Sequence, residues 1–149
     1  MKTNLYKEVE KFLKKYPGTI AFRIKKHCEV IERHIDKDEH IIYAFVGQKN
    51  KHWYDITSTH VFVLTNKRLM IATKRIVFGY FLYSITPEMF NDLTVYSGLF
   101  FGKVTIDTVK ELIYITNLSK DCLDEIETNI SSFMIEEKRK YGLKEVKNS

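Results

Sequence analysis

Between residues 41 and 117 the chain is a series of short apolar segments separated by turn residues, and this pattern restricts the fold more than any other feature. Each segment has the length of a strand and is rich in β-branched and aromatic residues, and turn signals recur about every 8–12 residues. Such spacing is typical of a small antiparallel sandwich or barrel. The predicted strands span residues 41–48, 58–65, 67–74, 76–85, 89–97, 101–109 and 111–117.

Apolar residues at helical spacing flank the predicted strands on both sides. We expect a first helix over residues 4–16 and a second from an N-cap at Thr19 to Ile35. A third amphipathic stripe starts at Leu118, and Gly142 is a typical residue to end that helix. A long helix with one apolar stripe must bury the stripe. We expect it to cover the open mouth of the barrel.

Seven antiparallel strands followed by one amphipathic helix resemble the pleckstrin-homology (PH) superfold. Four segments also resemble bacterial PH domains in sequence and in order, and the resemblance covers about residues 30–140. The chain is most similar to the YokE-like branch of that family. The segments are "IERHIDKDEHIIYAFVG" (31–47), "FVLTNKRLMIAT" (62–73), "ITPEMFNDLTVYSGLFFGKVTIDT" (85–108) and "YITNLSKDCLDEIETNI" (114–130).

The resemblance implies an α+β, mainly β fold: a PH-like seven-stranded antiparallel barrel or sandwich with a C-terminal capping helix, preceded by two N-terminal helices. We divide the chain into a helical pair (1–37), a bacterial PH-like domain (38–143) and a frayed tail (144–149). The family implies a binding module, but no catalytic or lipid-binding motif comes with it. The fold does not by itself name a function.

The net charge of +5 is unevenly distributed along the chain. Residues 1–37 carry ten Lys or Arg against five Asp or Glu, whereas residues 38–118 carry eight against seven and residues 119–149 six against seven. Nucleic-acid binding favours one dense basic face on the folded domain. The basic excess lies instead in the N-terminal segment, which argues against nucleic acid as a partner.

The corner between the second and third strands, Thr65 to Arg68, carries two adjacent cations. Asn66 tolerates a positive φ, so an Asn-Lys pair suits a tight hairpin turn. Phosphate binding needs several converging donors, and Lys67 and Arg68 stand alone. We interpret both as turn residues, with their stems along the sheet and their charged heads in water.

A second basic group follows from the topology of an antiparallel meander, in which the loops after the first and third strands lie at the same end. Lys49, Lys51 and His52 follow the first strand, and Lys74 and Arg75 end the third. We expect these residues to cluster at one rim. The rim is either a solvated basic surface or a site for an anion or lipid headgroup. The basic spacing typical of PH domains that bind phosphoinositides is not matched here.

Two apolar stretches indicate contacts beyond an ordinary core. The loop "SGLFFGK" (97–103) places Leu99, Phe100 and Phe101 between two glycines. There they would cover one end of the core, contact a second subunit or enter a membrane interface. The predicted strand 76–85 is apolar on both faces, unlike a strand that is half exposed to water. We expect the N-terminal helices or a second subunit to cover its outer face.

The sequence does not indicate catalysis, a cofactor or a bound metal. His27 and His34 share a helix face but stand about 10 Å apart, too far to ligate one metal. Cys28 and Cys122 fall on apolar helix stripes, which predicts buried structural thiols. We find no nucleophile motif, Gly-rich phosphate loop or HExxH motif. The start of the chain does not read as a secretory signal, so we expect a cytoplasmic protein, peripheral at the inner membrane face if it binds lipid.

The sequence therefore favours a non-catalytic binding module for a protein partner or for a second copy of itself. The alternative is peripheral binding to anionic membrane headgroups through Lys49, Lys51, Lys74 and Arg75, aided by the apolar loop at residues 98–101.

Overall fold

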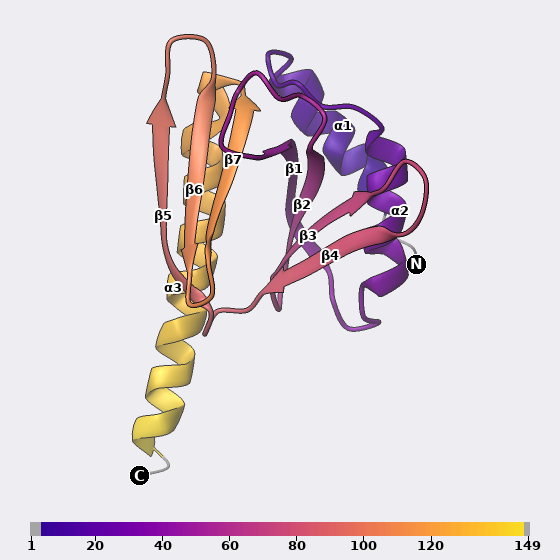
Figure 1. The fold of residues 1–149 in the computed structure, drawn as a ribbon. Helices are drawn as coiled ribbons and strands as arrows, with labels where there is room; N and C mark the ends of the chain where they lie inside the picture. The colour runs from indigo at the N-terminus through magenta and orange to yellow at the C-terminus, as the bar shows by residue number, and fades with distance from the viewer. Residues whose placement is uncertain (1–3, 148–149) are drawn as a thin grey trace.

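A computed structural model describes residues 4–147, apart from the side chains of residue 141 and of residues 143–147. Within this range two helices are followed by seven strands and a C-terminal helical segment, as predicted (Figure 1). The elements are α1 Leu5–Lys15, α2 Ile24–His34, β1 Ile41–Lys49, β2 Thr59–Thr65, β3 Leu69–Lys74, β4 Tyr80–Ile85, β5 Phe90–Ser97, β6 Gly102–Thr108, β7 Leu112–Leu118, the short 3-10 helix η1 Lys120–Cys122, and α3 Leu123–Lys147.

The strands form one antiparallel sheet in the order β4-β3-β2-β1-β7-β6-β5. β1 joins the two halves of the sheet but pairs with β7 only at Gln48↔Thr116 and Lys49↔Ile115. The rest of β1 pairs with β2, so the sheet bends there into two halves set at an angle (Figure 1). β4 and β5 lie at the two edges. The PH-like fold is confirmed. The sheet is curved, and in the described chain its edge strands β4 and β5 do not pair with each other.

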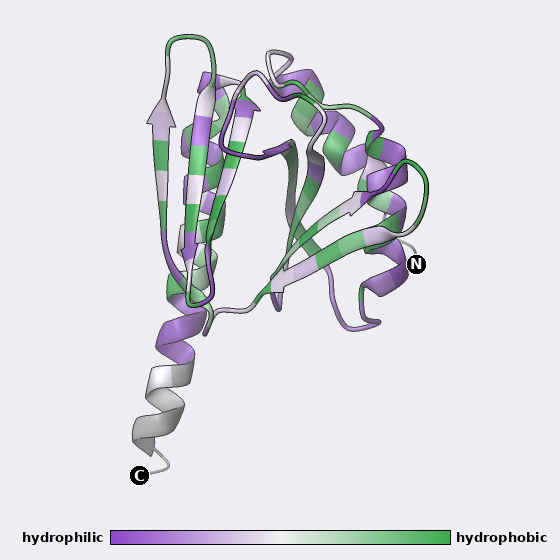
Figure 2. Cartoon of the chain, viewed as in Figure 1, coloured by the Kyte–Doolittle hydropathy of each residue, from purple (hydrophilic) through white to green (hydrophobic). Residues whose placement is uncertain are grey.

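The helices supply much of the core. α1 and α2 lie against the β1–β4 half, and α3 lies against β5 and β6 (Figure 1). Hydrophobic and hydrophilic residues alternate along β6, as Figure 2 shows, and the hydrophobic ones are buried. The apolar stripe of α3 at Ile126, Ile130 and Met134 is fully buried, as a capping helix requires. The domain boundary at residue 37 stays a prediction; the N-terminal helices and the sheet share one hydrophobic core.

β4 begins at Tyr80, so the strand predicted over residues 76–85 starts too early. Ile76, Val77 and Phe78 lie in the β3–β4 loop and are exposed. Gly79 has a φ of +74°, and its carbonyl accepts a hydrogen bond from the Arg75 N–H at 3.1 Å, which closes the loop. Glycine adopts this backbone conformation without steric cost. The apolar run therefore comprises a surface loop and a strand.

α2 covers the outer face of β4 only in part. The Tyr80 hydroxyl lies 3.1 Å from His34 Nε2, yet the Tyr80 side chain remains 47% exposed. Of the two covers expected for this strand, the helical one is present but incomplete.

Two helix ends differ from the prediction. α2 begins at Ile24 rather than after Thr19, whose hydroxyl instead accepts a hydrogen bond from the Ser119 N–H at 2.9 Å. The α1–α2 linker is therefore fastened to the start of the C-terminal helical segment. α3 continues through Gly142, because one glycine in an exposed helix costs only about 1 kcal/mol. Of the predicted tail, residues 148–149 lie outside the described residues.

At the β2–β3 corner, Arg68 forms an ion pair that the sequence analysis did not anticipate. Its Nη2 lies 2.9 Å from Glu39 Oε1, and its Nε lies 3.1 Å from Oε2. The fully buried Glu39 carboxylate also accepts hydrogen bonds from the Thr65 hydroxyl and the Asp36 N–H. Burial alone would raise the pKa of Glu39, but these hydrogen bonds outweigh it and the pKa is lowered. The Arg68 head is thus part of the fold and does not lie in water as expected.

Lys67 has a weaker partner. Its Nζ lies 2.7 Å from Asp38 Oδ2, and both side chains are exposed, so the pair contributes little stability. Both cations of the corner have carboxylate partners, which supports the interpretation of the corner as structural.

Candidate binding surface at the loop end

Three loops lie at the strand ends opposite the β2–β3 corner, and we call this region the loop end. They are the β1–β2 loop (50–58), the β3–β4 loop (75–79) and the β5–β6 loop (98–101). The ring of Trp53 in the first loop lies 6.1 Å from that of Phe100 and 6.4 Å from that of Phe101 in the third. The first two loops line one pocket together. The β1–β2 loop therefore lies beside each of the other two loops.

The loop end exposes an unusual number of large apolar side chains. Phe78 is 83% exposed and Leu99 82% exposed. A core residue at the end of a barrel would be covered, so the interpretation of Leu99 and Phe100 as core is not supported. Exposed apolar clusters of this kind mark interaction surfaces. The exposed members at this end are Phe22, Trp53, Tyr54, Ile56, Ile76, Val77, Phe78, Leu99 and Phe100.

The predicted basic rim is divided among several places. Lys49 Nζ lies 5.7 Å above the ring of Phe81, and Lys51 Nζ lies 5.3 Å above the ring of Tyr114. The ring of His52 stacks on that of Tyr54 with centroids 5.1 Å apart. These side chains thus point in different directions, although their backbone positions are adjacent.

Lys74 and Arg75 lie at a second place, in a pocket of about 860 Å³ between the β1–β2 and β3–β4 loops. Arg23 joins them there, donating from Nη1 to the Lys74 carbonyl at 3.1 Å. Arg23 has a left-handed backbone, with φ at 57°. Among the described residues, none of these three cations forms an ion pair with a carboxylate.

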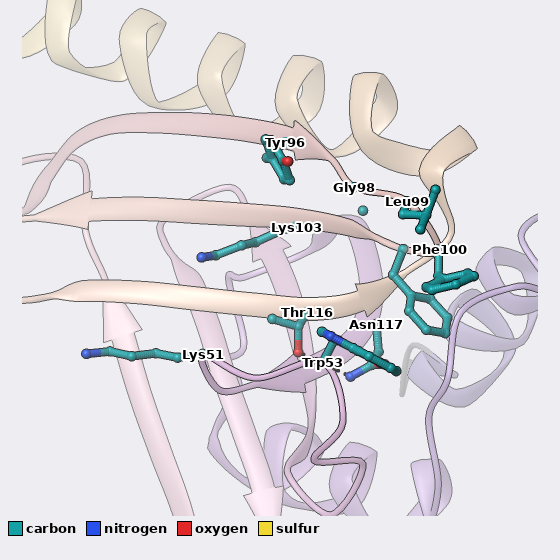
Figure 3. Close-up of a pocket in the computed structure, with 11 residues that line it drawn as sticks. Lys51, Trp53, Tyr96, Gly98, Leu99, Phe100, Lys103, Thr116 and Asn117 are labelled. Atoms are coloured by element: carbon teal, nitrogen blue, oxygen red, sulfur yellow. Dashed lines mark hydrogen bonds between the residues drawn. The ribbon is translucent and has the colours of Figure 1, made fainter.

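A smaller pocket of about 310 Å³ lies on the other side of the β1–β2 loop, on the outer face of β6 and β7 (Figure 3). We call it the β6–β7 pocket. Lys51 and Lys103 border it, and their ammonium groups lie 5.3 and 4.7 Å from the ring of Tyr114. Trp53 and the β5–β6 loop form its apolar wall.

Burial shifts the pKa values of several histidine and cysteine side chains. His27 is buried, and its Nδ1 accepts a hydrogen bond from the Lys74 N–H at 2.8 Å. Burial lowers the pKa of His27 to about 4 and also lowers the pKa of His60. Burial raises the pKa of the Cys28 and Cys122 thiols to about 12. Both cysteines are the buried structural thiols that the sequence predicts.

The sequence was compared with profiles of known protein families to find the family of this chain. A family profile described as "Bacterial PH domain" matches residues 35–132. The chain belongs to the bacterial PH domain family. The match does not single out a branch, so the YokE-like resemblance stays a prediction. Comparison with curated proteins gives no match.

Solved structures of bacterial PH domains are similar to this one at low sequence identity. A pleckstrin homology domain from Shewanella amazonensis SB2B is 16% identical, with a TM-score of 0.49 over 72% of this chain and 95% of that one. A DUF1696 family protein with a pleckstrin-homology domain from Shewanella loihica PV-4 is also 16% identical, with a TM-score of 0.46 over 73% and 87%. In this bacterial PH domain, no helix of the described chain is long and apolar enough to cross a membrane.

Among the residues that line the β6–β7 pocket, the sequence does not predict Lys103, Thr116 or Asn117. The alternation of β6 already contained a signal for the first, because Lys103 has the parity opposite to buried Val104. Alternate residues of a strand point to opposite faces. The position of Asn117 beneath the β1–β2 loop had no such signal.

The neutral His27 predicts a pH dependence of stability. Its folded pKa lies below the unfolded value of about 6.5, so its contribution is present above that pH and is lost as the pH falls towards 4. We expect a His27→Gln variant, which keeps an acceptor for the Lys74 N–H, to lose about 1–2 kcal/mol less stability than the parent between pH 7 and pH 5. Urea unfolding at both pH values measures this. Equal losses would show that His27 protonates freely in the folded domain.

Proposed function

We propose that this bacterial PH domain is a non-catalytic binding module whose loop end docks onto anionic membrane surfaces. The observation that carries the proposal is that exposed apolar side chains lie near cations that form no ion pair within the described part of the chain. Phe78 projects from one loop tip and Leu99 from another, and Arg75 lies beside the first. A bilayer interface accepts separate apolar wedges, whereas a protein partner needs a continuous complementary face.

The charge of the loop end supports the same function. The three loops contain one carboxylate, Asp55, which accepts hydrogen bonds from the Thr57 N–H and hydroxyl at 2.9 and 2.7 Å. Each cation near an anionic leaflet contributes about 1 kcal/mol of binding energy. Burial of a large apolar side chain contributes about 1.5–3 kcal/mol. Several such residues acting together are sufficient for reversible attachment.

Co-sedimentation with vesicles tests the proposal. We expect binding to phosphatidylglycerol-rich vesicles, weakened by salt, and little binding to phosphatidylcholine vesicles. A Lys51→Gln/Lys74→Gln/Arg75→Gln variant should bind about tenfold or more weakly, since it loses three cations. An Ile76→Ser/Phe78→Ser variant should be similarly weakened.

The matched control for this experiment lies at the opposite end of the domain. Val109 and Lys110 are exposed in the β6–β7 turn, so a Val109→Ser/Lys110→Gln variant should bind like the parent. The proposal fails if the parent does not bind anionic vesicles, or if the loop variants bind as tightly as this control.

The alternative function is binding to a protein or to a second copy of the chain. The observation that favours it is the edge strand β4, which pairs with β3 alone in the described sheet and leaves Tyr80 and Phe81 about half exposed. An unpaired edge can accept a strand from another chain. Light scattering at high protein concentration separates the two functions. A dimer disrupted by Leu82→Pro would favour self-association through this edge.

A further inference from the structure

The β6–β7 pocket has a polar floor that is incompletely satisfied. Asn117, at the end of β7, lines the pocket and is completely buried. Its φ of 62° is left-handed, a conformation that Asn tolerates better than most residues. Its Oδ1 is buried and has no hydrogen-bond partner among the described residues. An unpaired buried acceptor costs about 1–3 kcal/mol.

A chain of hydrogen bonds fixes which atom of the Asn117 amide is left over. Asn50 Nδ2 donates to the Asp55 carbonyl at 2.7 Å, so Asn50 Oδ1 is the acceptor for the Thr116 hydroxyl at 2.5 Å. Since the Thr116 hydroxyl donates there, its oxygen accepts from Asn117 Nδ2 at 3.2 Å. The atom without a partner is therefore the oxygen of Asn117. A group that satisfies it must bring an O–H or N–H donor.

The two ends of the pocket differ in chemistry. Trp53, Leu99 and Phe100 lie at the end nearest the loop tips, whereas the side chains of Lys51 and Lys103 extend the other way along the strands (Figure 3). Neither ammonium group has a carboxylate partner among the described residues. From the loop tips towards the strands, the pocket therefore presents an apolar wall, a buried acceptor and two lysine side chains.

We propose that the β6–β7 pocket binds a single-chain phosphate amphiphile that carries a hydroxyl group between its tail and its phosphate, as in a monoacylglycerol phosphate. The tail packs against Trp53 and the β5–β6 loop, the hydroxyl donates to Asn117 Oδ1, and the phosphate lies between Lys51 and Lys103. Two ammonium groups complement a phosphate as point charges. This inference goes beyond vesicle docking, because one dissolved molecule suffices to fill the pocket.

The single tryptophan of the chain, Trp53, reports on the pocket by its fluorescence. The probe is 1-lauroylglycerol 3-phosphate below its micelle concentration, compared with glycerol 3-phosphate, inorganic phosphate and monolauroylglycerol. We expect saturable binding of the complete probe, at least tenfold tighter than that of any of the three fragments. Glycerol 3-phosphate binding as tightly as the complete probe would overturn the proposal in favour of a soluble phosphate ligand. Absence of saturable binding by the complete probe would also overturn it.

Substitutions of the pocket residues test each proposed contact with the probe. Lys51→Gln and Lys103→Gln should each weaken binding of the complete probe fivefold or more, and Lys110→Gln at the opposite end should not change it. Asn117→Gly keeps the left-handed backbone and removes the acceptor. It should weaken the complete probe fivefold but leave a deoxy probe, lauroyl-propanediol phosphate, unchanged. Equal losses for both probes would contradict the role given to Asn117, and unchanged binding in both lysine variants would contradict the phosphate site.

Discussion

Replacing Arg68 with methionine is expected to lower the free energy of unfolding by about 3–5 kcal/mol. The substitution removes the guanidinium that lies 2.9 Å from Glu39 Oε1 and leaves that carboxylate buried without a counter-charge. It also removes donors to the His34 carbonyl and the Ser84 hydroxyl. Urea unfolding at pH 7 measures the loss.

The pH dependence of that loss separates charge from packing. In the parent the pKa of Glu39 is lowered, so its stabilisation is present above about pH 4.3 and is lost as the pH falls through the folded pKa. In Arg68→Met, burial raises the pKa of Glu39. As the pH falls, protonation of Glu39 therefore removes the buried, unpaired charge that destabilises the variant. The gap between the two proteins should shrink to about half at pH 4, and a Glu39→Gln/Arg68→Met double variant should recover stability at pH 7. A gap independent of pH would indicate lost packing instead.

The Phe62→Ala variant is expected to lose about 3–5 kcal/mol of stability. Phe62 is completely buried, and its ring stacks on that of Phe45 with centroids 4.8 Å apart and an interplanar angle of 7°. Truncation removes that stack and leaves a cavity in the half of the sheet that α1 and α2 cover. Thermal unfolding followed by circular dichroism measures the change.

Phe100→Ala is the matched control, because it makes the same chemical change at a side chain that is 68% exposed. It should change stability by no more than about 0.5 kcal/mol while weakening vesicle binding. If Phe100→Ala destabilised the domain as much as Phe62→Ala, the β5–β6 loop would be part of the core and not a free surface.

The sequence predicts the order of helices and strands well, because periodicity reports on which faces are buried. The clean alternation of β6 and the stripe on α3 at Ile126 and Ile130 both correspond to buried faces. The run at Ile76 to Phe78 is misread because periodicity cannot distinguish an apolar strand from an apolar loop. Gly79, with its positive φ, marks the true boundary.

The candidate site was predictable at the level of loops and not of side chains. Antiparallel topology places the β1–β2 and β3–β4 loops at one end, and they do line one pocket. The direction of each long side chain depends on its neighbours. Lys51 therefore extends over Tyr114 and away from Lys74, and this could not be read from spacing. The Arg68–Glu39 pair is not predictable from spacing either, because 29 residues separate the partners in the sequence.

The central claim, that the loop end enters an anionic membrane, is tested most directly by quenching of Trp53 with lipids brominated on their acyl chains. Trp53 is the only tryptophan and lies at the loop end, 55% exposed. In phosphatidylglycerol-rich vesicles we expect a blue shift and strong quenching by the brominated chains, both abolished in Ile76→Ser/Phe78→Ser. Vesicle-bound protein whose Trp53 emission is neither shifted nor quenched would show that the domain meets the membrane by another face, and the account would be wrong.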